Sequence, residues 1–275
     1  MTLSTPGNIA FIGGGNMASA IIGGLLKQGT PAARIQIVEP WAEQRTRLEQ
    51  QFGITAAALP DAALASAGLV VWAVKPQTFR EAAGQAGPHT GQALHLSVAA
   101  GIRSDSIARW LGTERIVRAM PNTPALVGLG LTGLFARPAV TPAQRQSVQD
   151  LIATTGQFLW LDEEQQLDAV TALSGSGPAY VFYFLEAMMQ AGVQMGLSAA
   201  QARTLAVGTF SGASALAAAS EDPPELLRAR VTSKGGTTHA AITSMEADTV
   251  QQHFMRALHA ARQRAVELGD EFGTS

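Results

Sequence analysis

Residues 9–18 read Ile-Ala-Phe-Ile-Gly-Gly-Gly-Asn-Met-Ala, an apolar run followed by the spacing Gly-x-Gly-x-x-Ala. The apolar run predicts a buried strand, and helical spacing begins at Met17. Gly13 permits a tight turn after the strand, and Gly15 leaves room for a pyrophosphate to approach the backbone. The small Ala18 lets the helix and the strand pack closely. Because these residues occur in a strand–turn–helix context, they predict a dinucleotide-binding loop.

The sequence beyond this loop alternates short apolar runs with helical patterns. Such alternation is typical of right-handed crossovers and of a parallel sheet covered by helices on both faces. We therefore expect an α/β fold with an N-terminal Rossmann-type domain over residues 1–162. Buried strands are predicted at residues 8–12, 34–38, 69–74, 93–98 and 115–119, and two further short strands at 131–136 and 157–161. Helices are predicted at 17–28, 42–51, 104–111 and from about Pro142.

From residue 163 onward the strand signals vanish, which predicts an all-helical domain over residues 163–275. We expect helices at residues 163–173, 177–195, 199–219, 224–231 and 249–268. The second of these is apolar nearly all round, with Tyr180, Phe182 and Tyr183 on different faces, so it must be buried on most sides. In a domain of this size, such burial favours packing against a second copy of the chain.

The composition excludes several classes of function. The chain has 275 residues, 47% of them hydrophobic, and a formal net charge of −2, which offers no electrostatic reason to bind nucleic acid or an anionic membrane. It has no cysteine, so disulfides and a cysteine nucleophile are excluded. No long apolar run predicts a membrane span, no secretory signal pattern appears, and no metal-ligand spacing is present. We expect a soluble cytoplasmic protein without a metal site.

Several loops follow the predicted strands and should line one crevice. In an open parallel sheet, the ligand crevice lies outside the carboxyl ends of the strands. Loops after the strands supply small or polar residues there, and Lys75 can contact a phosphate or ribose or simply be solvated. The predicted cofactor-binding residues are Gly13, Gly15, Asn16, Met17, Ala18, Glu39, Ala73, Val74, Lys75, Pro76, Val98, Ala99, Ala100 and Asn122.

Glu39 follows the second predicted strand, where an acidic side chain commonly accepts a hydrogen bond from the ribose 2′-hydroxyl. This placement favours NADH, because a 2′-phosphate would be repelled. Arg45 and Arg47 lie slightly downstream and can contact that phosphate if the loop carries them inward. The sequence therefore leaves NADH and NADPH as alternatives.

A second loop lies within the helical region, where residues 231–239 read Val-Thr-Ser-Lys-Gly-Gly-Thr-Thr-His. Two adjacent glycines let the backbone turn tightly, and Thr237 and Thr238 stand at the expected start of the next helix. Free N–H donors and the helix dipole favour an anion at that point. The loop therefore suits a small carboxylate, although taken alone it is more typical of an ordinary turn between helices.

Together these stretches resemble the pyrroline-5-carboxylate reductase family. The glycine loop is shared by many dehydrogenases. The Ser-x-Gly-Gly-Thr-Thr segment from Ser233, combined with Ser-Gly-Ser-Gly-Pro-Ala-Tyr from Ser174, is far more specific. The resemblance extends from about Ile9 to Leu268. Two departures are Glu39, where NADPH-preferring members carry small or polar residues, and Lys234, which replaces a proline found in many members.

The resemblance implies the reduction of 1-pyrroline-5-carboxylate to L-proline by hydride from NADPH or NADH, the last step of proline biosynthesis. It also implies a helical domain that intertwines between subunits, giving a homodimer and a higher ring such as a decamer. Thr238 is the expected catalytic residue, as hydrogen-bond partner or proton donor to the ring nitrogen. The predicted substrate-binding residues are Ser233, Gly235, Gly236, Thr237, Thr238 and Ser176.

Two rival functions fit the sequence less well. A β-hydroxyacid dehydrogenase shares the two-domain plan but needs a lysine on the long helix after the sheet domain, and residues 177–195 contain none. A non-catalytic NAD(P)-binding protein of the same fold would be expected to carry a damaged loop at residues 235–238, which here is intact.

Overall fold

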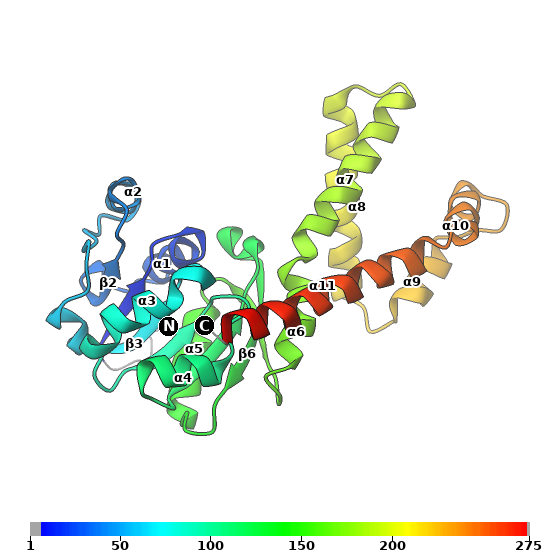
Figure 1. Cartoon of the computed structure of the whole chain (residues 1–275). Coiled ribbons are helices and arrows are strands. Elements are labelled where there is room, and N and C mark those ends of the chain that lie inside the picture. Colours follow the sequence, from blue (N-terminus) through cyan, green and yellow to red (C-terminus); the bar gives the residue numbers. More distant parts are fainter. Residues whose placement is uncertain (1–6, 274–275) are drawn as a thin grey trace. The chain divides into compact units, whose positions relative to one another are not determined.

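The computed structural model describes residues 7–273, within which seven strands form one sheet (Figure 1). Their order across the sheet is β2-β1-β3-β4-β5-β6-β7. All seven strands predicted from the apolar runs are present, with ends displaced by at most two residues. They are β1 (Asn8–Ile12), β2 (Ile35–Val38), β3 (Ala67–Trp72), β4 (Leu94–Ser97), β5 (Ile116–Met120), β6 (Gly130–Ala136) and β7 (Gly156–Trp160).

The sheet is parallel, as expected, except at one strand pair. Strands β5 and β6 are antiparallel, whereas the other neighbours pair in parallel. The connection between them is a short loop with one 3₁₀ turn, Thr123–Val127. A parallel pair needs a crossover of about a dozen residues or more, and this loop is too short to provide one.

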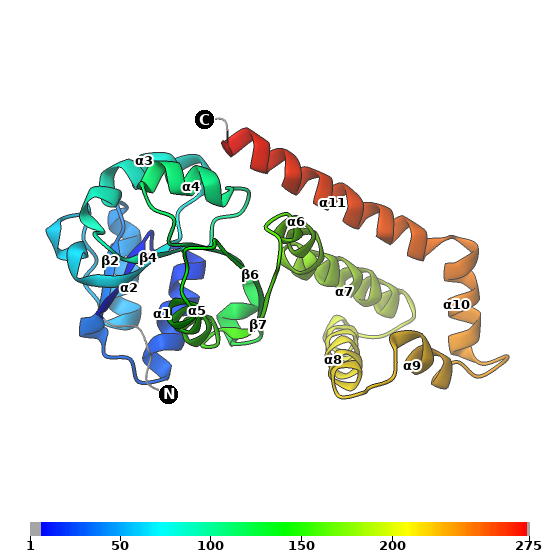
Figure 2. The same ribbon diagram turned by 90° about the horizontal axis from the view of Figure 1, so that it is seen from below.

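Helices cover both faces of the sheet and enclose two hydrophobic cores (Figure 2). Helices α1 (Asn16–Lys27), α2 (Ala42–Phe52) and α5 (Pro142–Ile152) contribute to the core that includes Phe11 and Leu96. Helices α3 (Pro76–Ala86) and α4 (Ser104–Leu111) contribute to the core around Trp72. The sequence patterns did not predict helix α3. Short 3₁₀ segments lie at Ala32–Arg34, Ala62–Ser66 and Gly87–His89.

The chain divides into two compact units. The first runs to Ser176 and resumes at Ala261, and the second comprises Gly177–Ala260. The expected functional boundary between residues 162 and 163 stays a prediction. In place of the single helix expected at 163–173, the structure has α6 (Gln166–Val170) followed by a π-helical turn, Thr171–Gly175. The remaining helices are α7 (Gly177–Gln194), α8 (Ala199–Ala218), α9 (Pro224–Arg230), α10 (Thr237–Ala247) and α11 (Val250–Gly273).

The second unit has almost no core of its own within one chain. Among its hydrophobic side chains, only those of Ala202 and Ala206 are buried. On α7, Phe182 is 58% exposed and Tyr183 is 71% exposed. A unit that leaves large apolar side chains in water lacks the burial needed to offset its conformational entropy, so it needs a partner surface. No helix within residues 7–273 is long and apolar enough to cross a membrane.

The core around Trp72 contains one titratable side chain, His95 on β4. It is buried, and its Nδ1 accepts a hydrogen bond of 3.0 Å from the indole Nε1 of Trp72. Burial, and secondarily the charge of Arg115, lowers the pKa of His95 from 6.5 to about 4. The imidazole is therefore neutral in the folded protein at pH 7, with Nδ1 as acceptor.

This histidine makes stability depend on pH. Its pKa is lower in the folded chain, so between its folded value of about 4 and its unfolded value of 6.5 the unfolded chain binds more protons. Its contribution is therefore complete above the unfolded pKa and is lost as pH falls toward the folded pKa. We expect the free energy of unfolding to drop by about 2 kcal/mol from this group between about pH 7 and pH 5. His95→Gln, which keeps an acceptor for Trp72, should flatten that dependence in urea titrations at fixed protomer concentration. An equally steep dependence in the variant would contradict the assignment.

Candidate functional site

The glycine loop between β1 and α1 has the geometry that the sequence predicts. Gly13 has a φ of +94°, and a Cβ there would lie 2.7 Å from the carbonyl oxygen of Ala73. Its N–H donates to the carbonyl of Val38 at 2.8 Å. A side chain at this position would therefore be strained and would also push the ends of β1 and β3 apart.

Gly15 differs from Gly13 in what its missing side chain would meet. A Cβ on Gly15 would have no protein atom within 4 Å. The absence of a side chain therefore leaves free space next to the backbone of the loop, on its solvent side. Gly15 is the N-cap of α1, and no side chain caps that helix. The first N–H groups of α1, from Asn16 and Met17, thus lack intrahelical acceptors and face an open approach. This arrangement fits a pyrophosphate.

A cavity of about 440 Å³ lies at the carboxyl ends of β1, β2 and β3. The chain runs from β1 to β2 on one side and then crosses to β3 on the other side of β1, so the cavity occupies the topological switch point of the sheet. Most of its lining was not predicted from the sequence. Trp41 and Leu59 line it and are 73% and 68% exposed. The one sequence signal is the position of Trp41, three residues after the end of β2.

Glu39 lies beneath the glycine loop. It is buried, and its Oε2 accepts a hydrogen bond of 2.8 Å from the N–H of Gly14. Its Oε1 accepts a second bond, of 2.9 Å, from the N–H of Trp41. Both carboxylate oxygens are therefore held by the backbone of the two loops that border the cavity.

The loop after β4 carries the predicted cofactor residues Val98, Ala99 and Ala100. Its next residue, Gly101, has a φ of +71°, and a Cβ there would lie 3.0 Å from the Cβ of Leu268 on α11. Phe272, also on α11, packs against the core around Trp72. The last turns of α11 thus support this loop, a contact across more than 160 residues that no local pattern indicates.

Asn122, predicted to bind cofactor, forms two hydrogen bonds within the protein. Its Nδ2 donates to the carbonyl of Ser174 at 3.1 Å, and its Oδ1 accepts from the N–H of Leu131 at 2.9 Å. Gly175 lies so close to Met120 that a Cβ would be 2.4 Å from the methyl carbon of that methionine. Asn122 therefore joins the π-helical turn to the end of β5. The predicted substrate-binding residue Ser176 directly follows that turn, close to the carboxyl end of β5. π-Helical turns often occur at functional sites.

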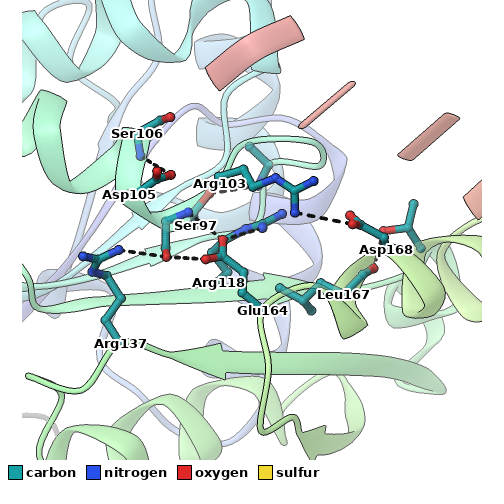
Figure 3. A network of polar contacts seen from close by, with 12 residues as sticks. Ser97, Arg103, Asp105, Ser106, Arg118, Arg137, Glu164, Leu167 and Asp168 are labelled. Carbon is teal, nitrogen blue, oxygen red and sulfur yellow. Dashed lines mark hydrogen bonds and ion pairs between the residues drawn. The ribbon is translucent and has the colours of Figure 1, made fainter. Parts of the chain in front are cut away.

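Partly buried ion pairs connect β5, the start of α4 and the α6 region (Figure 3). Arg118 on β5 contacts Glu164 with 2.7 Å between Nη1 and Oε1. Glu164 also accepts bonds of 2.6 Å from the N–H and the hydroxyl of Ser104, at the first turn of α4. Arg103 pairs with Asp168 on α6 at 3.4 Å. Glu164 therefore accepts the hydrogen bonds of Ser104 at the start of α4, the helix that follows the loop after β4.

Burial lowers the pKa of the Arg118 guanidinium from its ordinary value, and the charge and hydrogen bond of Glu164 oppose that shift. An arginine still stays protonated at neutral pH, because its ordinary pKa is so high. Arg118 therefore keeps its positive charge in the interior, where the neighbouring carboxylate of Glu164 stabilises that charge.

The second predicted loop lies in the other unit and forms a tight turn before α10. Gly235 has a φ of +76°, which favours glycine, and the N–H of Gly236 donates to the carbonyl of Ser233 at 3.0 Å. Helix α10 begins at Thr237 with Gly236 as its N-cap, and no side chain caps it. The helix start expected at Thr237 is confirmed, and the first-turn N–H groups of Thr237 and Thr238 are available to an anion.

The predicted site residues fall into two groups. The predicted cofactor residues and Ser176 lie in the first unit, mainly at the carboxyl ends of β1–β5, whereas Ser233, Gly235, Gly236, Thr237 and Thr238 lie in the second. Their individual roles stay predictions. Among residues 7–273, no three His, Asp or Glu side chains gather in a way that would hold a metal ion.

Comparison with known proteins identifies the family. The family model described as pyrroline-5-carboxylate reductase dimerisation matches residues 164–268, and one described as NADP oxidoreductase, coenzyme F420-dependent, matches residues 8–101. The chain is 46% identical to the pyrroline-5-carboxylate reductase of Pseudomonas aeruginosa, over 98% of this chain and 100% of that protein. The chain belongs to the pyrroline-5-carboxylate reductase family.

Solved structures of the same family agree in fold. The chain is similar to a pyrroline-5-carboxylate reductase from Coxiella burnetii, with 37% identity, a TM-score of 0.87, and coverage of 96% of this chain and 98% of that one. It also resembles the Plasmodium falciparum pyrroline carboxylate reductase solved with NADP bound, with 26% identity, a TM-score of 0.87, and coverage of 96% and 99%. The predicted Rossmann-type domain followed by a helical dimerisation domain is confirmed.

Proposed function

We propose that this chain reduces 1-pyrroline-5-carboxylate to L-proline by hydride transfer from NADH or NADPH, the last step of proline biosynthesis. The observation that carries the proposal is family membership along nearly the whole chain, at 46% identity to a curated reductase. The chain is accordingly an NAD(P)H-dependent oxidoreductase acting on a C=N bond.

The first unit fits the nicotinamide cofactor on its own geometry. The open space over Gly15, the uncapped start of α1 and the cavity at the switch point suit a pyrophosphate and an adenosine. The residues that would hold the cofactor are those predicted from the sequence, with Trp41 and Leu59 added at the cavity. When bound, the reduced cofactor supplies the hydride.

The proposed role of the second loop is to hold the substrate. Backbone N–H groups at residues 235–238 would bind the carboxylate of the imine, with further donors from Ser233 and Ser176. Once protonated, the C=N group accepts hydride at carbon, so the protein needs mainly to hold the ring at near-attack distance. Thr238 would hydrogen-bond the ring nitrogen, either as proton donor or by orienting a water.

The assembly follows from the helical unit. Its exposed apolar side chains and the match to the dimerisation family make the chain a homo-oligomer. We extend this to a homodimer that builds a ring of five dimers, in which a substrate site can combine two chains. A biosynthetic reductase of this class would work in the cytoplasm.

The test is a direct assay of the purified assembled protein. We expect oxidation of NADH or NADPH on addition of pyrroline-5-carboxylate, with proline formed in equal amount by amino-acid analysis. Omitting the imine, or replacing it with proline at neutral pH, should leave the cofactor absorbance at 340 nm unchanged. Cofactor binding without any turnover of this imine would refute the enzymatic function and favour a binding protein.

A further inference from the structure

The backbone holds the Glu39 carboxylate in one place. Its two oxygens accept from the N–H groups of Gly14 and Trp41 at 2.8 and 2.9 Å, and the residue is only 7% exposed. Each carboxylate oxygen can accept more than one hydrogen bond, so the two backbone bonds do not use up the acceptor capacity of the carboxylate. Glu39 is therefore a fixed negative charge with spare acceptor capacity.

The loop above this carboxylate cannot move away easily. The carbonyl of Gly14 accepts a bond of 2.6 Å from the Nε2 of Gln44, while its N–H is bound to Glu39. A Cβ at Gly14 would lie 2.5 Å from Leu48, so α2 packs directly on this peptide. If Glu39 turned aside, the buried N–H of Gly14 would lose its acceptor, which is unfavourable. The charge therefore stays in position when a ligand enters.

The charges around the cavity are unfavourable for an additional phosphate. Among the residues that line it, the one charged side chain is Glu81, which is acidic. The nearest arginine on this turn, Arg45, donates through Nη1 to the carbonyls of Glu39 and Pro40, at 3.0 and 2.7 Å. These two contacts hold the Arg45 guanidinium against the backbone of the turn.

From this geometry we propose that the chain selects NADH over NADPH, and that Glu39 is the residue that decides the choice. The inference rests on the proposed function only in that the cofactor is a nicotinamide dinucleotide. A ribose 2′-hydroxyl can donate to the fixed carboxylate, whereas a 2′-phosphate brings two like charges together in a partly desolvated place. The carboxylate cannot avoid this by rotating, because two backbone N–H groups hold it.

The first measurement needs no variant and no turnover. Calorimetric titration of the assembled protein with NADH and with NADPH, without imine, should give NADH the lower Kd by about tenfold or more at moderate salt. With pyrroline-5-carboxylate present, kcat/KM should show the same order. Equal affinities, or tighter binding of NADPH, would overturn the proposal while leaving the reductase function standing.

Variants then assign the preference to one residue. Glu39→Gln removes the charge at nearly constant size and should reduce the NADH preference severalfold or abolish it, mainly by improving NADPH binding. Glu81→Gln removes the one charge that lines the cavity and should lower the NADH preference less than Glu39→Gln does, whereas Arg45→Ala should leave it unchanged. A preference that disappears in Glu81→Gln instead, or NADPH affinity that falls in Arg45→Ala, would reject Glu39 as the selector. Thermal melts of each variant check folding, and the wild-type comparison decides the preference if Glu39→Gln does not fold.

Discussion

Glu164→Ala is expected to lower the free energy of unfolding by about 3–5 kcal/mol, the range typical of breaking a buried ion pair by removing one partner. The change leaves the guanidinium of Arg118 buried without its carboxylate, 2.7 Å away in the wild type. It also removes the acceptor of the Ser104 N–H and hydroxyl at the start of α4. Urea unfolding at fixed protomer concentration measures the effect, because oligomerisation links stability to concentration.

Two further variants separate charge burial from a general loss of contacts. Arg118→Met combined with Glu164→Leu removes both charges and should recover most of the loss, since an apolar pair of similar volume needs no desolvation of ions. Glu267→Ala deletes a surface partner of Arg264 on α11 and should leave the unfolding midpoint almost unchanged. A loss in Glu164→Ala below about 1 kcal/mol would show that water replaces the carboxylate readily.

Thr238→Ala is expected to lower kcat by about 100-fold, the lower end of what a positioned acid–base or orienting group contributes. The hydroxyl stands on the second residue of α10, after the glycine turn, where it would contact the ring nitrogen of the imine. Loss of the hydroxyl and the γ-methyl group leaves the helix start intact, because no side chain caps this helix. Steady-state kinetics with pyrroline-5-carboxylate, together with cofactor titration, measure the effect, and the Kd of the cofactor should stay the same.

The neighbouring threonine provides the control. Thr237→Ala deletes a hydroxyl on the adjacent residue of the same turn and should change kcat by only a few-fold, since only its backbone N–H is assigned to the carboxylate. Thr238→Ser keeps a hydroxyl and should restore most of the activity. If Thr238→Ala has wild-type kcat, or if Thr237→Ala loses as much, the proposed role of Thr238 is wrong.

Much of the fold could be predicted because it depends on local patterns. Strands β1–β6 are short apolar runs whose residues are mostly buried, and such runs can be recognised without knowing their neighbours. The glycine loop and the start of α10 were recognised for the same reason, since a positive φ at Gly13 or Gly235 depends on the nearby chain. Helix α3 was not named, although Pro76 stands at its first turn.

Other features could not be predicted because they depend on contacts distant in sequence. The direction of β6 followed from how little chain joins it to β5, whereas the alternating pattern suggested another parallel strand. The cavity lining was missed because Trp41 and Leu59 come from separate loops that meet only at the sheet edge. The region expected as one helix at 163–173 forms the short helix α6 followed by a π-helical turn. In that turn Ser174 contacts Asn122, and Gly175 lies against Met120.

The sequence by itself determined the seven strands, the glycine turns, the uncapped helix starts and the family, since each depends on residues close together or on whole-chain similarity. Only the tertiary structure decided what the charged residues do. It holds Glu39 against Gly14, pairs Arg118 with Glu164, and sets the end of α11 behind Gly101. The physical reason is that a buried charge is stable only where its partners surround it, and packing alone brings partners 25 or 46 residues apart in the chain into contact.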